Sequence, residues 1–151
     1  MATAPPHGIF VPVPTFFAKR SSPSYDPVSP PLDIETQLTH SIFLARAGVR
    51  GLVLLGSTGE AVHITRKERT TLIKAIRHGL TERGFLNFPL IAGTATNSID
   101  ETVELLKESA DAGVSWGLVL APGYFSGTAS QEGLVEWYTA VADRSCIPIL
   151  V

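Results

Sequence analysis

The sequence predicts an α/β protein built on a parallel sheet. Five short apolar runs lie along the 151 residues, and a helical pattern follows each of the first four. The runs are apolar throughout instead of alternating with polar residues, which indicates strands buried on both faces and joined by right-handed helical crossovers. Two architectures fit about five strands and four helices in this order: an open doubly wound sheet, or part of a (β/α)8 TIM barrel.

The expected strands are residues 9–13, 52–55, 88–92, 117–121 and 147–151. Between the first strand and the first helix lies a Pro/Ser-rich segment, residues 21–31, with the sequence SSPSYDPVSPP. Its composition would suit a polyproline II recognition segment, but a long loop is favoured because apolar pattern resumes on both sides of it. We therefore expect residues 1–151 to form a single domain that contains this loop.

Capping signals mark where the helices begin. Asp33 can cap the first helix. Thr65 and Glu68 have the spacing of a capping box before the second helix, and Ser98 and Glu101 repeat that spacing before the third. The fourth helix is expected over about residues 130–143. In each helix the apolar residues recur every three or four positions, as in Ile34, Leu38, Ile42 and Ala45, so each helix has one face to bury.

Composition and charge exclude several classes of partner. The 12 basic and 14 acidic residues leave a net charge of -2 and form no basic stripe, so nucleic acid is not an expected partner. No apolar run approaches the roughly 20 residues of a membrane helix, and residues 1–8 do not resemble a secretory signal, so no membrane association and a cytoplasmic location are predicted. The single cysteine, Cys146, excludes a disulfide framework and is expected to be buried.

The candidate site is the loop Gly56 to Glu60, GSTGE, which directly follows the second apolar run. Ligands bind beyond the carboxyl ends of the strands in both architectures. Glycines let backbone N–H groups approach a ligand, and the hydroxyls of Ser57 and Thr58 add donors for an anion. A phosphate loop is one interpretation, although the next helix begins only near Thr65; a simple βα turn with no ligand is another. The lone His63 is read as structural, so no metal is expected.

Several segments, in order along the chain, resemble one family. GSTGE is similar to the Gly-Thr-Thr-Gly-Glu signature of the dihydrodipicolinate synthase and N-acetylneuraminate lyase family. The first strand, GIFVPVPTFF, resembles the family's opening strand. PLIAGTATNS resembles its third strand and the loop that follows, although Ala95 stands where many relatives have glycine. LVLAPGYFSGTASQEGLVEWYTAVAD resembles its fourth strand, tyrosine-bearing loop and next helix.

The resemblance implies a (β/α)8 class I aldolase that forms a Schiff base between a lysine and pyruvate or a related 2-oxo acid, without a cofactor. It implies that Gly56, Ser57 and Thr58 bind the carboxylate of this small-molecule partner, and that Thr58 relays protons to a tyrosine. Tyr124 is the candidate tyrosine, at a position where the family reaches across a subunit interface, so a homo-oligomer is expected. The adjacent Phe125 occupies the second position, where many relatives carry another tyrosine.

In the family, the strand similar to IPILV leads into a Tyr-Asn-x-Pro motif and then to the strand that carries the Schiff-base lysine. The resemblance therefore implies that residues 1–151 correspond to roughly the first five of eight βα units, with the C-terminal units missing, and we expect them to be inactive alone. The four lysines present are not expected to substitute: Lys67, Lys74 and Lys107 fall on predicted helices, and Lys19 lies in the Pro/Ser-rich loop.

The implied substrates of the whole enzyme are a 2-keto-3-deoxy sugar acid or 4-hydroxy-2-oxoglutarate. Two other functions stay open. The chain could be a non-catalytic protein that binds a 2-oxo acid through GSTGE, or a small α/β phosphate-binding domain. Saturable pyruvate binding without covalent trapping would favour the first, and preference for a nucleotide or sugar phosphate would favour the second.

Overall fold

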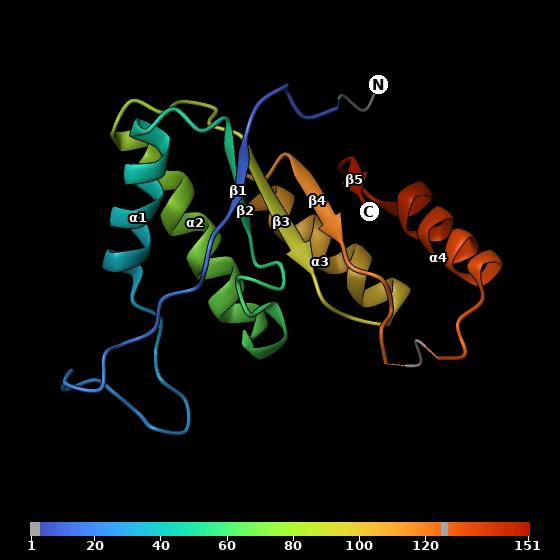
Figure 1. Ribbon diagram of the computed structural model, residues 1–151, viewed down its shortest axis with the longest axis horizontal. Coiled ribbons are helices and arrows are strands. Elements are labelled where there is room, and N and C mark those ends of the chain that lie inside the picture. The colour runs from blue at the N-terminus through green and yellow to red at the C-terminus, as the bar shows by residue number, and fades with distance from the viewer. Residues whose placement is uncertain (1–3, 125–126) are drawn as a thin grey trace.

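The computed structural model describes residues 4–124 and 127–151 and contains one five-stranded parallel sheet (Figure 1). Its strands lie in the order β1-β2-β3-β4-β5 and each pairs in parallel with the next. Their bounds are β1 Phe10–Pro12, β2 Gly51–Leu54, β3 Leu90–Thr94, β4 Trp116–Val119 and β5 Ile149–Leu150. The predicted α/β class with about five parallel strands is confirmed.

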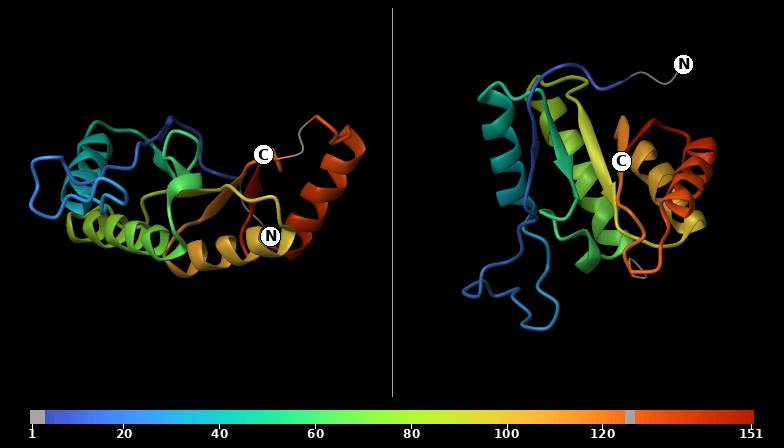
Figure 2. Two further views of the ribbon diagram at one scale, coloured as in Figure 1. Left: turned by 90° about the horizontal axis from the view of Figure 1, so that it is seen from below. Right: turned by 45° about the vertical axis from the view of Figure 1, so that its right-hand side comes forward.

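In the described part of the chain, four α-helices connect the strands: α1 Ile34–Arg46, α2 Arg66–Glu82, α3 Ile99–Asp111 and α4 Gln131–Arg144. A single 3-10 turn, η1 Ala61–His63, lies between β2 and α2. The strand order distinguishes the two candidate architectures, because a doubly wound sheet reverses its order part-way and a barrel does not. Here the order is sequential, and the helices follow one another around one face of the sheet (Figure 2). The barrel interpretation is confirmed, and the doubly wound sheet is wrong.

Two of the predicted helix caps form as expected. The Asp33 carboxylate accepts a hydrogen bond from the backbone N–H of Thr36 at 2.9 Å. At α2, the backbone N–H of Glu68 donates to the Thr65 hydroxyl, and the backbone N–H of Thr65 donates to the Glu68 carboxylate at 3.0 Å. Both donors would otherwise lack a partner within the helix, so this capping box fixes where α2 begins.

The capping box predicted for α3 is only half present. Ser98 accepts from the backbone N–H of Glu101, but the Glu101 carboxylate turns away and lies 3.4 Å from the guanidinium of Arg66 on α2. Arg66 also contacts Glu104 and Glu108 of α3, at 3.0 and 2.7 Å. A cation shared by three carboxylates competes with a single backbone N–H for Glu101. Sequence spacing could not reveal this competitor, which comes from the neighbouring helix.

The apolar faces of the helices pack against the sheet in two clusters. The larger joins β2 and β3 to α1 and α2, and the smaller joins Leu106 of α3, Val119 of β4 and Val141 of α4. Burial of these side chains is the main source of stability. The prediction that Cys146 is buried is wrong: it is exposed, because it lies in the bend that leads into the edge strand β5.

The Pro/Ser-rich loop leaves the body of the molecule and returns to it at a narrow base (Figure 1). The backbone N–H of Ala18 donates to the carbonyl of Pro31 at 2.8 Å, and Phe17 pairs with Leu32 in an isolated antiparallel bridge. Asp33, directly after this bridge, then caps α1. The loop thus joins β1 to α1 without disturbing either element. Among the described residues, no helix is both long and apolar enough to cross a membrane.

Candidate functional site

The GSTGE segment forms a compact turn at the carboxyl end of β2. The backbone N–H of Gly59 donates to the carbonyl of Gly56 at 3.1 Å, and that of Glu60 donates to the carbonyl of Ser57 at 3.2 Å. Ser57 and Thr58 lie at the tip and are exposed, whereas Gly56 and Gly59 are buried. Within the described part of the chain, nothing accepts a hydrogen bond from the backbone N–H of Ser57 or Thr58. Two amides and two hydroxyls are therefore available to an anion.

The turn begins and ends on residues in the left-handed conformation. Leu55 has φ +55° and Glu60 has φ +53°, a region that side-chain-bearing residues rarely adopt. Leu55 is also fully buried, with 1% of its surface exposed. Each such residue costs on the order of 1–3 kcal/mol and persists only where its surroundings hold it. Ala95, which stands where many relatives have glycine, is not among the described residues with a positive φ. The strained residues of this turn are Leu55 and Glu60, which the sequence pattern did not mark.

Two glycines hold the strained backbone of Leu55. A Cβ placed on Gly59 would lie 2.7 Å from the backbone nitrogen of Leu55. A Cβ on Gly93 of β3 would meet the carbonyl oxygen of Leu55 and would lie 2.9 Å from the Cα of Gly56. All of these atoms are backbone, so rotation of a side chain cannot relieve the clash. The close approach of Gly59 and Gly93 fixes where the GSTGE turn leaves the sheet.

A buried threonine also contacts the turn, and the sequence analysis did not select it. The hydroxyl of Thr15, which follows β1, donates to the carbonyl of Gly59 at 2.7 Å. Thr15 is 7% exposed. The only sequence signal was its place in the GIFVPVPTFF segment, where a polar residue follows an otherwise apolar strand.

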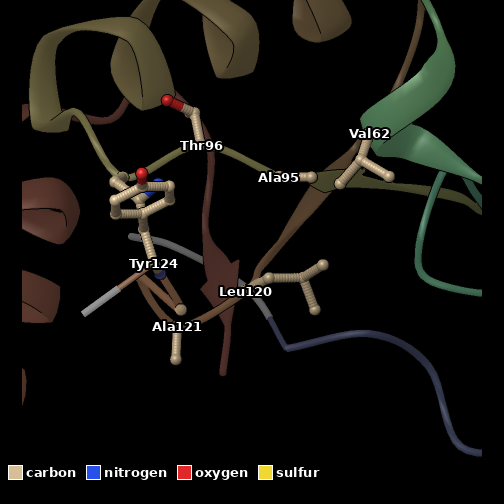
Figure 3. A pocket seen from close by; sticks show the side chains of 8 residues that line it. Val62, Ala95, Thr96, Leu120, Ala121 and Tyr124 are labelled. Atoms are coloured by element: carbon tan, nitrogen blue, oxygen red, sulfur yellow. The ribbon is translucent and has the colours of Figure 1, made fainter. Parts of the chain in front are cut away.

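Tyr124 follows β4 at the same edge of the sheet. Its side chain is 79% exposed, and its backbone N–H donates to the Asn97 side chain at 3.1 Å. It lines an open cavity of about 280 Å³ whose walls are mostly apolar, formed by Val62, Ala95, Thr96, Asn97, Leu120, Ala121 and Gly123 (Figure 3). Thr58 is not among the lining residues, so this cavity does not bring the two predicted catalytic side chains together. Phe125 lies outside the described residues.

Behind this edge, α2 and α3 are joined by a buried cation. Arg69 is 5% exposed, and its guanidinium donates to the Ser109 hydroxyl at 2.9 Å. Burial lowers the pKa of Arg69 to about 10, partly offset by the nearby Glu108 carboxylate. Because that value is well above 7, Arg69 stays charged at neutral pH. The hydrogen bond between Arg69 and Ser109 holds α2, the helix that follows the GSTGE turn and η1, against α3.

The lysines lie as expected from their sequence positions. Lys67 and Lys74 are exposed on α2, Lys107 is exposed on α3, and Lys19 is exposed in the loop after β1. None of these side chains is desolvated, which is one of the conditions that make a lysine nucleophilic. In residues 4–124 and 127–151 there is also no group of three or more His, Cys, Asp or Glu residues that could hold a metal ion.

The phosphate-loop interpretation is disfavoured by the placement of α2. This helix begins at Arg66, beyond η1, and the capping box of Thr65 and Glu68 already occupies the N–H of Glu68 in its first turn. A phosphate loop instead directs the N-terminus of the following helix at the anion. The donors of the GSTGE turn are therefore its own amides and hydroxyls.

Comparison with known proteins decides the family. Residues 32–151 match the model of the dihydrodipicolinate synthetase family. The chain belongs to this family. An L-threo-3-deoxy-hexylosonate aldolase from Aspergillus niger is 44% identical over 145 residues, which are 95% of this chain and 41% of that protein. A protein from Emericella nidulans named as a mitochondrial 4-hydroxy-2-oxoglutarate aldolase is 40% identical and is covered over 44% of its length.

Solved structures of this family share the fold. A dihydrodipicolinate synthase family protein from Coccidioides immitis superposes with a TM-score of 0.78 at 31% identity, over 96% of this chain and 43% of that one. The dihydrodipicolinate synthase from Acinetobacter baumannii, solved with pyruvate, superposes with a TM-score of 0.77 at 30% identity, over 94% of this chain and 44% of that one. The chain thus spans less than half the length of the relatives it matches. Because a relative is named as mitochondrial, the cytoplasmic location stays a prediction.

Proposed function

We propose that the protein carrying this sequence is a Schiff-base aldolase that acts on a 2-oxo acid, with a 2-keto-3-deoxy sugar acid or 4-hydroxy-2-oxoglutarate as substrate. The observation that carries the proposal is the GSTGE turn, which presents unpaired amides and exposed hydroxyls at the carboxyl end of β2. Relatives named as aldolases of these substrates support the choice of substrate class. The solved relative with pyruvate supports a pyruvate-like ligand.

In this proposal the turn binds the carboxylate of the 2-oxo acid. The N–H groups and hydroxyls of Ser57 and Thr58 donate to its oxygens, and Gly56 leaves room for close approach. The ketone carbon is then held for attack by a lysine amine, and the ketone oxygen leaves as water. The resulting iminium accepts the electron pair of the breaking carbon–carbon bond. Thr58 and Tyr124 are proposed to pass the proton that this cleavage requires.

Tyr124 lies in a cavity separate from Thr58 and is widely exposed, which fits a residue completed by a neighbouring subunit. We therefore propose a homo-oligomer in the complete protein. The lysines within residues 1–151 lie on the outer helices or in an exposed loop, so we propose that these residues alone do not form the Schiff base. A capacity to bind a 2-oxo acid without reaction is the second candidate function for this part of the protein.

Borohydride trapping tests the proposal. Pyruvate and borohydride added to the complete gene product should attach one reduced pyruvate per chain through a secondary amine, detected by mass spectrometry. Thr58→Val should weaken pyruvate binding about 10- to 100-fold, since hydrogen bonds to a charged group are lost. Thr71→Val, at an exposed threonine on α2, is the matched control and should bind as wild type.

Two results would count against the proposal. Absence of trapping in the folded complete protein would refute the aldolase chemistry, and saturable pyruvate binding in that same protein would then favour the non-catalytic function. Trapping on residues 1–151 alone would show that one of the four lysines is reactive. It would contradict the proposal that this part does not form the Schiff base.

A further inference from the structure

From the contacts around the GSTGE turn we infer that Thr15 is a positioning residue for the 2-oxo acid site, held in place by Gln37 of α1. This inference rests on the proposed function. Thr15 does not touch the proposed ligand. It acts on the turn that does, because its hydroxyl donates to the carbonyl of Gly59 at 2.7 Å, and Gly59 directly follows Thr58.

The Thr15 contact is the kind of hydrogen bond that fixes geometry. Thr15 is only 7% exposed and Gly59 is buried, so water does not readily replace either partner. The two residues are 44 positions apart in the chain, and the bond therefore ties the segment after β1 to the turn after β2. Without this donor the carbonyl of Gly59 would stay buried with no hydrogen bond to offset its desolvation. The turn would then be expected to move toward another donor.

The segment that carries Thr15 is itself anchored from the other side. The backbone N–H of Phe16 donates to the side-chain oxygen of Gln37 at 3.1 Å, and the carbonyl of Phe16 accepts from the backbone N–H of Asp33 at 2.8 Å. Gln37 is 1% exposed on the inner face of α1. Residues 15 and 16 thus lie between α1 and the GSTGE turn, with polar contacts to both.

The backbone of the GSTGE turn is strained and requires neighbouring groups to stabilise it. It leaves β2 through Leu55, whose left-handed conformation is strained, and it ends at Glu60, which is also left-handed. Strained backbone relaxes unless neighbouring groups hold it. Gly59 packs against the Leu55 backbone, and Thr15 holds the carbonyl of that same glycine. The position of the Ser57 and Thr58 donors therefore depends on the Thr15 hydroxyl.

The test compares Thr15→Val, which keeps the shape and removes the hydroxyl, with Thr15→Ser, which keeps the hydroxyl. In the complete gene product we expect Thr15→Val to lower kcat/KM for the 2-oxo acid substrate on the order of 10- to 100-fold, and Thr15→Ser to restore most of it. The matched control is Thr102→Val. Thr102 is also fully buried, and it donates to the carbonyl of Ser98 at 2.8 Å within α3.

Thermal unfolding of each variant separates positioning from general stability. Thr15→Val and Thr102→Val should both unfold at lower temperature, but only Thr15→Val should lose activity at a temperature where both are folded. If Thr15→Val does not fold, Thr15→Ala takes its place with the same expectation. A folded Thr15 variant without the hydroxyl and with wild-type kcat/KM would overturn the inference.

Failure of the proposed function is distinguishable from failure of the inference. If the wild-type protein forms no adduct with pyruvate and borohydride, the proposed function is at fault. If the wild type is trapped and folded Thr15→Val is trapped at the same rate and pyruvate concentration dependence, only the inference about Thr15 is wrong.

Discussion

Substitution of Gly93 by alanine should displace the GSTGE turn, although Gly93 belongs to another strand, because the backbone of β3 packs against the start of this turn. The new Cβ would lie 2.8 Å from the carbonyl carbon of Leu55 and 2.9 Å from the Cα of Gly56, and it would also meet the Leu55 oxygen. Real Cβ atoms do not approach backbone this closely, so β2 and β3 must separate locally or the turn must shift.

The expected cost follows from two opposing effects. Overpacking of a rigid environment costs about 3 kcal/mol at the upper end of its usual range, and backbone neighbours place Gly93→Ala at that end. Replacing glycine lowers the entropy of the unfolded chain and returns about 1 kcal/mol. We therefore expect Gly93→Ala to lower the free energy of unfolding by about 2 kcal/mol. We also expect it to weaken pyruvate binding, since Leu55 and Gly56 precede Ser57 and Thr58, the proposed donors to the carboxylate.

Gly117→Ala is the matched control. Gly117 lies on the neighbouring strand β4, and its Cβ would also overlap an atom, but that atom is the end of the Leu106 side chain and not backbone, so a smaller adjustment relieves the overlap. Its cost should be about 1 kcal/mol or less, with pyruvate binding unchanged. Urea unfolding of the complete protein and calorimetric titration with pyruvate measure both quantities. The reasoning is refuted if Gly93→Ala unfolds and binds pyruvate as wild type does, or if Gly117→Ala is the more damaging change.

Two further predictions concern the helix caps. Thr65→Ala should lower the free energy of unfolding by about 1 kcal/mol, and by more than Ser98→Ala, because only Thr65 belongs to a complete capping box with Glu68; equal urea midpoints for the two variants would contradict this. Hydrogen bonds from Thr36 lower the pKa of Asp33, so the ionised carboxylate stabilises the fold above the unfolded-state pKa of 3.8, and this contribution is lost as pH falls. Asp33→Asn, whose side chain can still cap α1, should therefore be less stable than wild type at pH 7. Below about pH 3.8 the free energies of unfolding of the two proteins, measured by urea unfolding, should converge. A difference between them that grows on acidification would count against this assignment.

The fold was largely predictable because its signals are local. Apolar runs predicted the strands to within a few residues, and Asp33 and Thr65 marked helix starts at which the predicted caps form. These signals act over one turn of helix or one strand. Prediction failed where the outcome depended on more than the local pattern. The Glu101 carboxylate contacts Arg66 of α2 instead of closing a capping box, and Cys146 is exposed because it lies in the bend before the edge strand β5.

The sequence predicted where the candidate loop lies, but not its backbone conformation or the contacts that hold it. GSTGE after an apolar run predicted that Ser57 and Thr58 lie in a loop at a strand's carboxyl end, and the structure places them there, exposed at the tip of the turn. Nothing in the sequence identified Leu55 as left-handed, because leucine has no preference for that conformation. Nor did it single out Thr15, since a hydrogen bond across 44 residues has no local signature.

The sequence by itself determined the order of strands and helices, the helix starts and the loop that carries the donors, since each depends on residues close together in the chain. Only the tertiary structure decided how that loop is held. Gly93 from β3 and Thr15 from the segment after β1 converge on Leu55 and Gly59, and together they keep a strained turn in place. The physical reason is that strain persists only where several distant segments pack on it at once, and packing exists only in the folded chain.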